Sequence, residues 1–442
     1  MTDLATRDLA TREPASGLLP DRELPARDLL LDPTAVVGRL ARILATEGIL
    51  EIDACELVRV KYRVGESLRV VYRLRAGGRD RLVTGRLFRP GRSRTAYERA
   101  VARETASRRG LSRQVCHDPD LGVVWWTFPR DRKLGDLGWL TSPPRNLTHE
   151  VCLPEWRRTQ VVQYVPERSV TARTLDARSA TLAYAKAYGP STVPTAVASR
   201  MGHVARELRS TGEPVTAPTA IGWSATRRLL LMEAIPGQSW SALSGERLAR
   251  AMEGLGLAVA CLHGSAPADG LEPFGRLRPD RVQRSVDIIG RARPDVARHL
   301  DLVTARLRAA TPAAEAPVVL HGDCHPGNAL VDGEAVALID LDQMGLGPAA
   351  ADLGSLVARL RYAAAVGDLA ASDVAELEAR FMAGYAARRP LPTAASLAWH
   401  TAAALLAERA LRAVNRVNQA GLVHLDELVT AADSALTGGV PR

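Results

Sequence analysis

The first patterned part of the chain alternates apolar and polar residues along short stretches. The stretch VRVKYRVGESLRVVYRL covers residues 58–74, and DRLVTGRLF covers 80–88. A helical stretch comes next, and then GVVWWTFPRDRKLGDL at 122–137. Successive side chains of a β-strand point to opposite faces of the sheet, so alternation of this kind predicts strands. The pattern therefore indicates a unit of strands, one helix and further strands.

This order recurs roughly a hundred residues later in the sequence. Two strand-like stretches, a helical stretch and a third strand-like stretch follow one another, with the strand-like ones at 160–176, 180–188 and 227–243. Tyr62 corresponds to Tyr164, and Pro129 to Pro236. Two copies of one unit are the simplest account. The alternative is that similar turn chemistry arose twice by chance.

Helical spacing of apolar residues is found before the first copy of this unit and after the second. Asp32 and Pro33 suit the start of a helix that ends near Gly48, and residues 1–33 are interpreted as a flexible tail. From about residue 241 onward the pattern is that of amphipathic helices. The expected domains are therefore a cap at 34–150, a second copy at 151–240 and a helical part at 241–442.

Charge adds a preference for anionic ligands. The chain has 442 residues, of which 46% are hydrophobic and 24% charged, with a formal net charge of +9. This balance suits a nucleotide, and it also suits nucleic acid or an arginine-rich soluble surface. Aromatic residues make up only 4% and do not interleave with basic clusters. We therefore expect no nucleic-acid partner.

Cysteine usage and hydropathy indicate the compartment. The five cysteines have wide spacings and no CxxC pair, which favours reduced thiols over a disulfide framework. No signal-peptide pattern and no apolar run of membrane-spanning length is found. We expect a cytoplasmic protein without a membrane partner, and the sequence leaves its oligomeric state open.

The strongest chemical pattern lies in HGDCHPGN, residues 321–328, and in the strand-like run that ends at Asp340. Phosphoryl transfer from ATP needs a carboxylate to accept the hydroxyl proton and oxygen ligands for Mg²⁺. Asp323 is placed to serve as that carboxylate. Asn328, five residues later, and Asp340, at the end of the next run, supply suitable metal ligands. The alternative is that these residues only cap turns.

These motifs resemble the catalytic core of the aminoglycoside phosphotransferase and choline kinase-like family. The similarity covers roughly residues 155–440. It implies an α+β, protein-kinase-like bilobal fold, with a small antiparallel-sheet N-lobe and a mostly helical C-lobe. By position, Asp323 resembles the catalytic base, and Asn328 and Asp340 resemble the metal ligands. Asp352 resembles the residue that braces the catalytic loop; for Asp352 and for Asp342 we favour a structural role.

The resemblance extends upstream to the nucleotide site. The strand ATLAYAKAY places Lys186 where the family holds phosphates. Glu207 would be its helix partner, although this alignment is open. Backbone groups from Glu233 to Ile235 would meet adenine. The first copy has Arg86 where the second has Lys186, so it resembles a cap built as a degenerate N-lobe, without nucleotide.

Three functional hypotheses follow. The first is an ATP- and Mg²⁺-dependent kinase that phosphorylates a hydroxyl group of a sugar, an amino sugar or an antibiotic. The second is a kinase that acts on Ser or Thr of a peptide in a natural-product pathway. The third is a non-catalytic nucleotide-binding protein that kept the fold. The intact set of Lys186, Asp323, Asn328 and Asp340 favours the enzyme.

Overall fold

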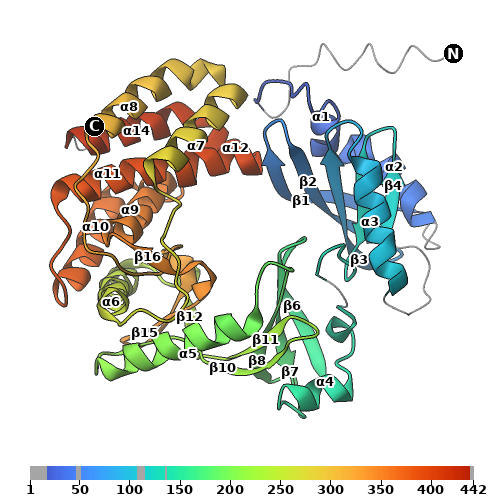
Figure 1. Cartoon of the computed structure of the whole chain (residues 1–442), viewed down its shortest axis with the longest axis horizontal. Coiled ribbons are helices and arrows are strands. Elements are labelled where there is room, and N and C mark those ends of the chain that lie inside the picture. Colours follow the sequence, from blue (N-terminus) through green and yellow to red (C-terminus); the bar gives the residue numbers. More distant parts are fainter. Residues whose placement is uncertain (1–16, 46–50, 107–114, 135–136, 439–442) are drawn as a thin grey trace. The chain divides into compact units, whose positions relative to one another are not determined.

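A computed structural model describes residues 17–45, 51–106, 115–134 and 137–438 (Figure 1). They form two compact units. Unit 1 comprises the described residues up to Leu137 together with Asp287–Arg298 and Leu411–Leu425, and unit 2 comprises the rest. The segment DLATRDLATRE, assigned to the tail, lies outside the described residues. The expected boundaries at 34–150, 151–240 and 241–442 remain predictions.

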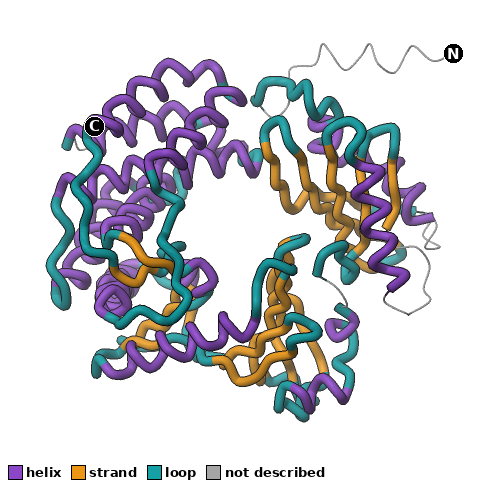
Figure 2. Tube along the Cα trace, in the orientation of Figure 1, coloured by secondary structure: helices purple, strands orange, loops and turns teal. Residues whose placement is uncertain are grey.

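Unit 1 contains a five-stranded antiparallel sheet in the order β1-β2-β3-β5-β4, shown among the orange strands of Figure 2. The strands are β1 (Ala54–Arg63), β2 (Ser67–Ala76), β3 (Arg79–Phe88), β4 (Val115–Asp118) and β5 (Val123–Thr127). Helix α3 (Ser93–Ala106) lies between β3 and β4 in the chain and packs on β4 and β5 through Ala100 and Trp126. The alternation seen in the sequence thus sorts apolar side chains onto the covered faces of the sheet.

The segment 17–33 corrects the prediction of a flexible tail. Helix α1 (Arg27–Leu31) lies within it, and α2 (Pro33–Ala45) begins at its last residue. Leu24 and Leu30 are fully buried. Arg27 is also buried, and its guanidinium donates to the Leu19 carbonyl at 2.7 Å and to the Tyr62 hydroxyl at 3.2 Å. Apolar residues spaced among charges at this end therefore pack instead of remaining in solvent.

Two segments from late in the chain complete unit 1. They include the last residues of α7 (Pro279–Ala292), and α12 (Leu411–Arg416) with α13 (Gln419–Val423). Arg416 donates to the Val60 carbonyl of β1 at 3.1 Å. The backbone N–H of Leu19 donates to the Ala292 carbonyl at 3.0 Å. The unit is consequently assembled from parts far apart in sequence.

Unit 2 begins with a second antiparallel sheet, in the order β6-β7-β8-β11-β10. Its strands are β6 (Arg158–Val165), β7 (Ser169–Leu175), β8 (Thr181–Tyr188), β10 (Ala220–Ser224) and β11 (Leu229–Glu233). Helix α5 (Pro194–Ser210) follows β8 and buries Val197, Met201, Val204 and Leu208, residues three or four apart. The predicted strands, including the strand that carries Lys186, are confirmed.

The two sheets share both topology and register. Tyr62 pairs with Leu68 as Tyr164 pairs with Val170, in each case one pair before the turn. Both turns have a left-handed residue at the same place, Gly65 with φ 68° and Glu167 with φ 63°. In the third strand, Arg86 and Lys186 occupy equivalent positions in the ladder. A common origin of the two units stays a prediction that this correspondence supports.

The remainder of unit 2 is mostly helical. Its helices include α6 (Gly245–Gly264), α8 (Ala297–Ala309), α9 (Ala350–Ala365), α10 (Ala371–Ala386), α11 (Ala394–Ala404) and α14 (Leu425–Thr437), with one π-helix at Leu405–Ala410. A four-stranded sheet joins β9 (Val215–Thr216), β12 (Gln238–Ser239), β14 (Ala329–Asp332) and β15 (Ala335–Leu338). Strands β13 (Val318–Leu320) and β16 (Gly345–Gly347) form a separate pair. The molecule therefore combines helices with antiparallel sheets, as expected.

None of the described helices is both long and apolar enough to cross a lipid bilayer. All five cysteines are free in the structure. Cys324, which lies within the loop 321–328, is buried, and burial raises the pKa of its thiol well above the usual value. It is therefore an inert part of the core.

Candidate active site

The loop 321–328 joins β13 to β14, and its shape depends on Gly322. This residue has φ +75°, and a Cβ there would clash with the carbonyl oxygen of Gln343. Only glycine combines this left-handed conformation with so close an approach of a second backbone segment. The loop is thereby pressed against the turn that follows Asp340.

Asp352 fixes the same loop from the start of α9. Its carboxylate accepts the backbone N–H of His321 at 2.6 Å and of Gly322 at 3.0 Å, and His263 Nε2 lies 3.2 Å from it. Burial alone would raise the pKa of Asp352, but the hydrogen bond from His263 and the loop N–H groups lower it below the ordinary value. Asp352 therefore braces the loop as an ionised group, in the structural role that the sequence indicated, and His263 supports it.

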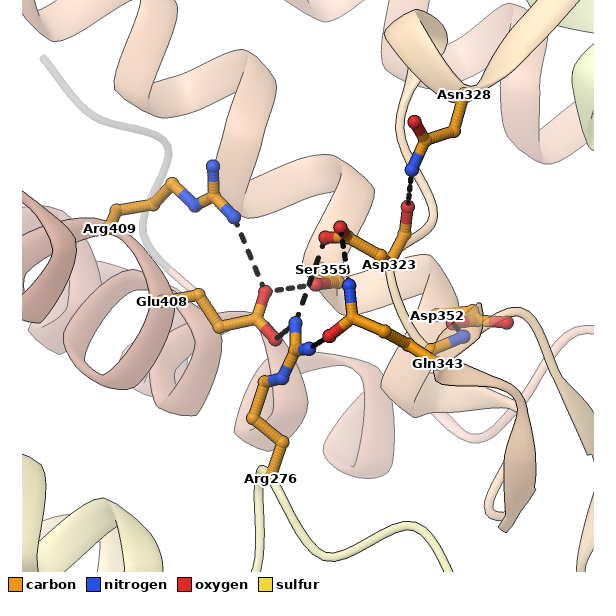
Figure 3. Close-up of polar contacts among 9 residues, drawn as sticks. Arg276, Asp323, Asn328, Gln343, Asp352, Ser355, Glu408 and Arg409 are labelled. Carbon is orange, nitrogen blue, oxygen red and sulfur yellow. Dashed lines mark hydrogen bonds and ion pairs between the residues drawn. The ribbon is translucent and has the colours of Figure 1, made fainter. Parts of the chain in front are cut away.

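Asn328 and Asp323 lie together at the two ends of this loop (Figure 3). The side-chain amide Nδ2 of Asn328 donates to the backbone carbonyl of Asp323 at 2.9 Å. Because the nitrogen is used in this way, the amide oxygen of Asn328 is the atom left to act as a ligand. His321 Nε2 lies 3.0 Å from the Ile339 carbonyl, so His321 ties the loop to the residue before Asp340.

The second pair of polar side chains joins β8 to the turn after β15. Lys186 Nζ is 2.7 Å from Asp340 Oδ1 and 2.7 Å from Asp342 Oδ2. Tyr188 donates its hydroxyl to Asp342 at 3.0 Å. Burial by itself would lower the pKa of Lys186, but the two carboxylates outweigh it and the pKa is raised. The lysine is therefore a fixed cation at neutral pH.

Gln343 links the two pairs. It is the last residue of the 3₁₀ turn η5 (Leu341–Gln343), which directly follows Asp340. Its side-chain Nε2 donates to Asp323 Oδ2 at 2.7 Å. Asp340 adopts a left-handed conformation with φ 59° and ψ 49°, and this conformation turns the chain as it enters η5. One short turn thus presents Asp342 to Lys186 and Gln343 to Asp323.

The environment of Asp323 keeps this carboxylate ionised. Burial alone would raise its pKa, but Arg276, whose Nη1 is 3.7 Å from Asp323 Oδ1, and further cationic groups lower it. Its side chain is 19% exposed, so the carboxylate still reaches solvent. A buried yet accessible carboxylate of this kind can accept a proton from a hydroxyl group held beside it.

Glu207, the expected helix partner of Lys186, lies outside this group of side chains. Glu207 does not meet Lys186: it is half-buried and accepts the backbone N–H of Ala266 at 3.0 Å. Lys186 pairs instead with the two aspartates described above, so the expected helix partner is absent from this arrangement. Glu207 is not among the buried residues of α5.

Glu233 and Ile235 lie where β11 ends and the chain runs on to β12. The backbone N–H of Glu233 is committed to the Thr219 carbonyl at 2.9 Å. Its carboxylate accepts the Thr219 hydroxyl at 2.9 Å. If the Glu233 backbone contacted adenine, it would therefore use its carbonyl oxygen. The backbone N–H that donates to adenine would have to be that of Ile235.

The donor set fits a hard divalent cation. Asp340 supplies a carboxylate whose side chain is 41% exposed, and Asn328 supplies an amide oxygen. Oxygen ligands of these two kinds, completed by phosphates and water, suit Mg²⁺. Within the described part of the chain, no three His, Cys, Asp or Glu side chains are grouped to hold a metal by themselves. A metal here would therefore depend on the phosphates as well as on protein.

Several residues of the site were missed in the sequence. Asp342 was interpreted as structural, but it shares Lys186 with Asp340. Gln343, Arg276 and Glu408 were not singled out. Gln343 follows the Asp340–Asp342 pair directly, and Glu408 and Arg409 interrupt an otherwise apolar helical run. An adjacent acid and base inside such a run is the pattern that would have drawn attention to the pair.

Comparison with known proteins agrees with the chemistry of these residues. Residues 183–391 match the model of the family described as the phosphotransferase enzyme family. This segment contains Lys186, the loop 321–328 and the turn at Asp340–Gln343. Among curated proteins, a search finds no match to the chain.

Several solved structures resemble the chain weakly. They include amicoumacin kinase hAmiN with AMP-PNP, Ca²⁺ and Ami (14% identity, 62% of this chain and 88% of that one, TM-score 0.45). Spectinomycin phosphotransferase APH(9)-Ia with ADP and spectinomycin is similar at 14% identity, 63% and 93% coverage, and TM-score 0.44. A choline/ethanolamine kinase family protein from Mesorhizobium loti shows 18% identity, 63% and 87% coverage, and TM-score 0.41.

Proposed function

We propose that the chain is a member of the phosphotransferase enzyme family, whose model residues 183–391 match, and that it transfers the γ-phosphate of ATP to a hydroxyl group of a small molecule. A sugar, an amino sugar or an antibiotic is the acceptor. One observation carries the proposal. The turn that presents Asp342 to Lys186 also presents Gln343 to Asp323, so the phosphate-binding cation and the proton acceptor are held by one element.

In the proposed reaction the acceptor oxygen attacks the γ-phosphorus while its proton passes to Asp323. The bond between the γ-phosphorus and the bridging oxygen breaks, and ADP leaves with the electron pair. Lys186 exchanges its aspartate partners for phosphate oxygens when ATP enters, since one ammonium cannot satisfy all of them. Asn328 and Asp340 would hold Mg²⁺, which neutralises phosphate charge.

The adenine would lie at the chain that follows β11. The carbonyl of Glu233 would accept from the base and the N–H of Ile235 would donate to it. Glu207 has no part in this proposal. Unit 1 would act as a cap without nucleotide, because Arg86 replaces the lysine and its guanidinium lies 4.9 Å from the Phe88 ring.

The proposal is tested with ATP, Mg²⁺ and a panel of acceptors. Thermal shift reports nucleotide binding, and an ATP-consumption screen over sugars, antibiotics and Ser/Thr peptides reports turnover. Asp323→Ala should lower turnover about 10²- to 10⁴-fold while ATP still binds, because it removes only the proton acceptor. Asp340→Ala should weaken the binding of Mg²⁺–ATP.

Asp332→Ala is the matched control for these variants. Asp332 is an exposed aspartate at the end of β14, between the two site aspartates in sequence. It should leave both readouts unchanged. Nearly full turnover by Asp323→Ala would exclude the proposed base. Binding of ATP without turnover of any acceptor would instead indicate a non-catalytic nucleotide-binding protein.

A further inference from the structure

The two oxygens of the Asp323 carboxylate have different surroundings (Figure 3). Gln343 Nε2 donates to Asp323 Oδ2 at 2.7 Å. No hydrogen bond from the described part of the chain reaches Asp323 Oδ1, and Arg276 Nη1 lies 3.7 Å from it. One oxygen is therefore held by an amide N–H, whereas the other keeps its lone pairs for a proton.

The amide of Gln343 can face Asp323 in only one orientation. Arg276 Nη2 donates to Gln343 Oε1. A guanidinium has donors and no acceptor, so it must meet the oxygen of the amide. The amide nitrogen is then left for Asp323. A reversed amide would set N–H against N–H at Arg276 and oxygen against oxygen at Asp323.

Arg276 is itself fixed by a buried carboxylate. Its Nη1 lies 3.2 Å from Glu408 Oε1, and the Glu408 side chain is only 3% exposed. The second oxygen of Glu408 accepts the Ser355 hydroxyl. Glu408 belongs to the π-helix Leu405–Ala410, and π-helical turns are frequent at functional sites. The ion pair with Glu408 therefore keeps the guanidinium beside Gln343.

The backbone on both sides of this contact is fastened as well. The loop that carries Arg276 is joined to β16, because Phe274 donates its N–H to the Leu346 carbonyl at 2.7 Å. Strand β16 begins two residues after Gln343. The carbonyl of Gln343 lies against Gly322, next to the proposed base in sequence. The side chain of Gln343 is thus fixed at its backbone and at both atoms of its amide.

We propose that Gln343 is a positioning residue for phosphoryl transfer, which holds Asp323 in one orientation through Oδ2 so that Oδ1 receives the proton of the acceptor hydroxyl. The proposal rests on the proposed function, since it takes Asp323 as the proton acceptor. As the proton passes to Oδ1, the acceptor oxygen bonds to the γ-phosphorus, and ADP leaves with the electron pair of the bond that breaks. Misplacement of a reacting group by about 1 Å can cost about a hundredfold in rate.

The kinetic test uses the acceptor that the ATP-consumption screen identifies. Gln343→Met removes the donor and keeps the length of the side chain. It should lower kcat about ten- to hundredfold while the KM for ATP stays within about twofold, because nucleotide binding does not use this contact. A kcat within about threefold of the native value would overturn the proposal, and so would a loss that appears in the KM for ATP instead.

Gln343→Glu separates positioning from a merely structural role. It keeps the shape of the side chain and an oxygen for Arg276, but it turns an oxygen instead of an N–H towards Asp323. Positioning by the N–H predicts that kcat falls at least as far as in Gln343→Met. If the contact with Arg276 were all that mattered, Gln343→Glu would retain the native kcat, and the proposal would be wrong.

A contact test needs no acceptor. The full chain is labelled with ¹⁵N at its glutamine side chains, and the NMR signals of the Gln343 amide are assigned by their loss in Gln343→Met. They should shift in Asp323→Ala, which removes the group that accepts the N–H. Signals that stay in place would overturn the proposal. Absence of all turnover with an intact contact would count against the proposed function, whereas turnover that is unaffected by Gln343→Met would count against the role of Gln343.

Gln283→Met is the matched control. Gln283 in α7 also accepts from an arginine, Arg308, but it does not contact Asp323. This variant should leave kcat and the KM for ATP unchanged. Urea unfolding shows whether each variant is folded. If Gln343→Met fails to fold, Gln343→Glu, which keeps the partner of Arg276, decides the kinetic test.

Discussion

Lys186 has two carboxylate partners in this structure, and this gives Asp342 a measurable role. In the proposed reaction the ATP phosphates displace Asp340 and Asp342 from the ammonium, and each carboxylate also repels them. Asp342→Asn should therefore tighten the binding of metal-free ATP about three- to tenfold, since a tenfold change is about 1.4 kcal/mol. Lys186→Met should weaken it.

Equilibrium binding of a fluorescent ATP analogue in the presence of a chelator would measure both changes. Weaker binding by Asp342→Asn would mean that Asp342 orients the lysine for the phosphates instead of competing with them. The exposed Asp332→Asn should bind as the unchanged protein does.

Asp352 connects the site to the pH dependence of stability. Its pKa is lowered in the folded state, so its contribution is present above the unfolded value, about 3.9, and is lost as pH falls through the lower folded value. Asp352→Asn should lower the free energy of unfolding by about 3 kcal/mol near neutral pH, because the buried charge holds two N–H groups and His263.

Urea unfolding at neutral pH and at pH below the folded pKa would measure this effect. The difference between Asp352→Asn and the unchanged protein should shrink at the acidic pH. A difference that stays constant over the range would exclude an ionised Asp352 as its cause.

The limits of prediction from sequence are visible at single residues. Asp323, Asn328 and Asp340 lie within 18 residues of sequence, so their spacing was enough to identify them as candidate site residues. Arg276 and Glu408 are 132 residues apart, and no local pattern reports that they meet. Glu207 was predicted to pair with Lys186, but it contacts Ala266. A helical pattern shows that a residue is in a helix, but it does not show which neighbour the side chain meets.

At the scale of elements, helices α6 and α10 lie in close backbone contact, and a glycine of each helix makes this possible. A Cβ on Gly384 would clash with the Glu253 carbonyl, and one on Gly256 would clash with the Phe381 carbonyl. Gly384→Ala should therefore lower the free energy of unfolding by about 1–3 kcal/mol. The measurement is urea unfolding of the full chain.

Gly202→Ala in α5 is the matched control. It is also inside a helix, but nothing lies within 4 Å of the added Cβ. There the substitution should stabilise the protein by up to about 1 kcal/mol, because alanine favours the helix more than glycine does. If Gly384→Ala also stabilised the protein, the backbones of α6 and α10 would not be in the close contact described here.

At this scale the sequence predicted more than it did for single residues. The alternating segments became strands, and the amphipathic stretches became helices, because each pattern depends on one buried face. The short strands β9 and β16 and the π-helix were not foreseen. They depend on contacts from distant segments and carry little periodicity of their own.

For the whole molecule, the equivalent sheets of the two units raise the question of how many nucleotides bind. Arg86 holds the position of Lys186, and unit 1 has no counterpart of the 321–343 segment. Titration calorimetry with Mg²⁺–ATP should therefore give one site per chain. Lys186→Met should reduce that binding, whereas Arg86→Met should leave the number of sites at one.

A second site of comparable affinity in the native chain, lost in Arg86→Met, would show that unit 1 binds nucleotide in its own right. The unit would then be a working copy and not a cap.

Unit 1 also determines when during synthesis the protein can finish folding. Its sheet is made by the first third of the chain, but Arg416, which donates to Val60, is translated near the end. Domains usually fold in the order in which they leave the ribosome. Here the first sheet to emerge must wait for almost the entire polypeptide, so a ribosome stalled before α12 carries an unfinished amino-terminal unit.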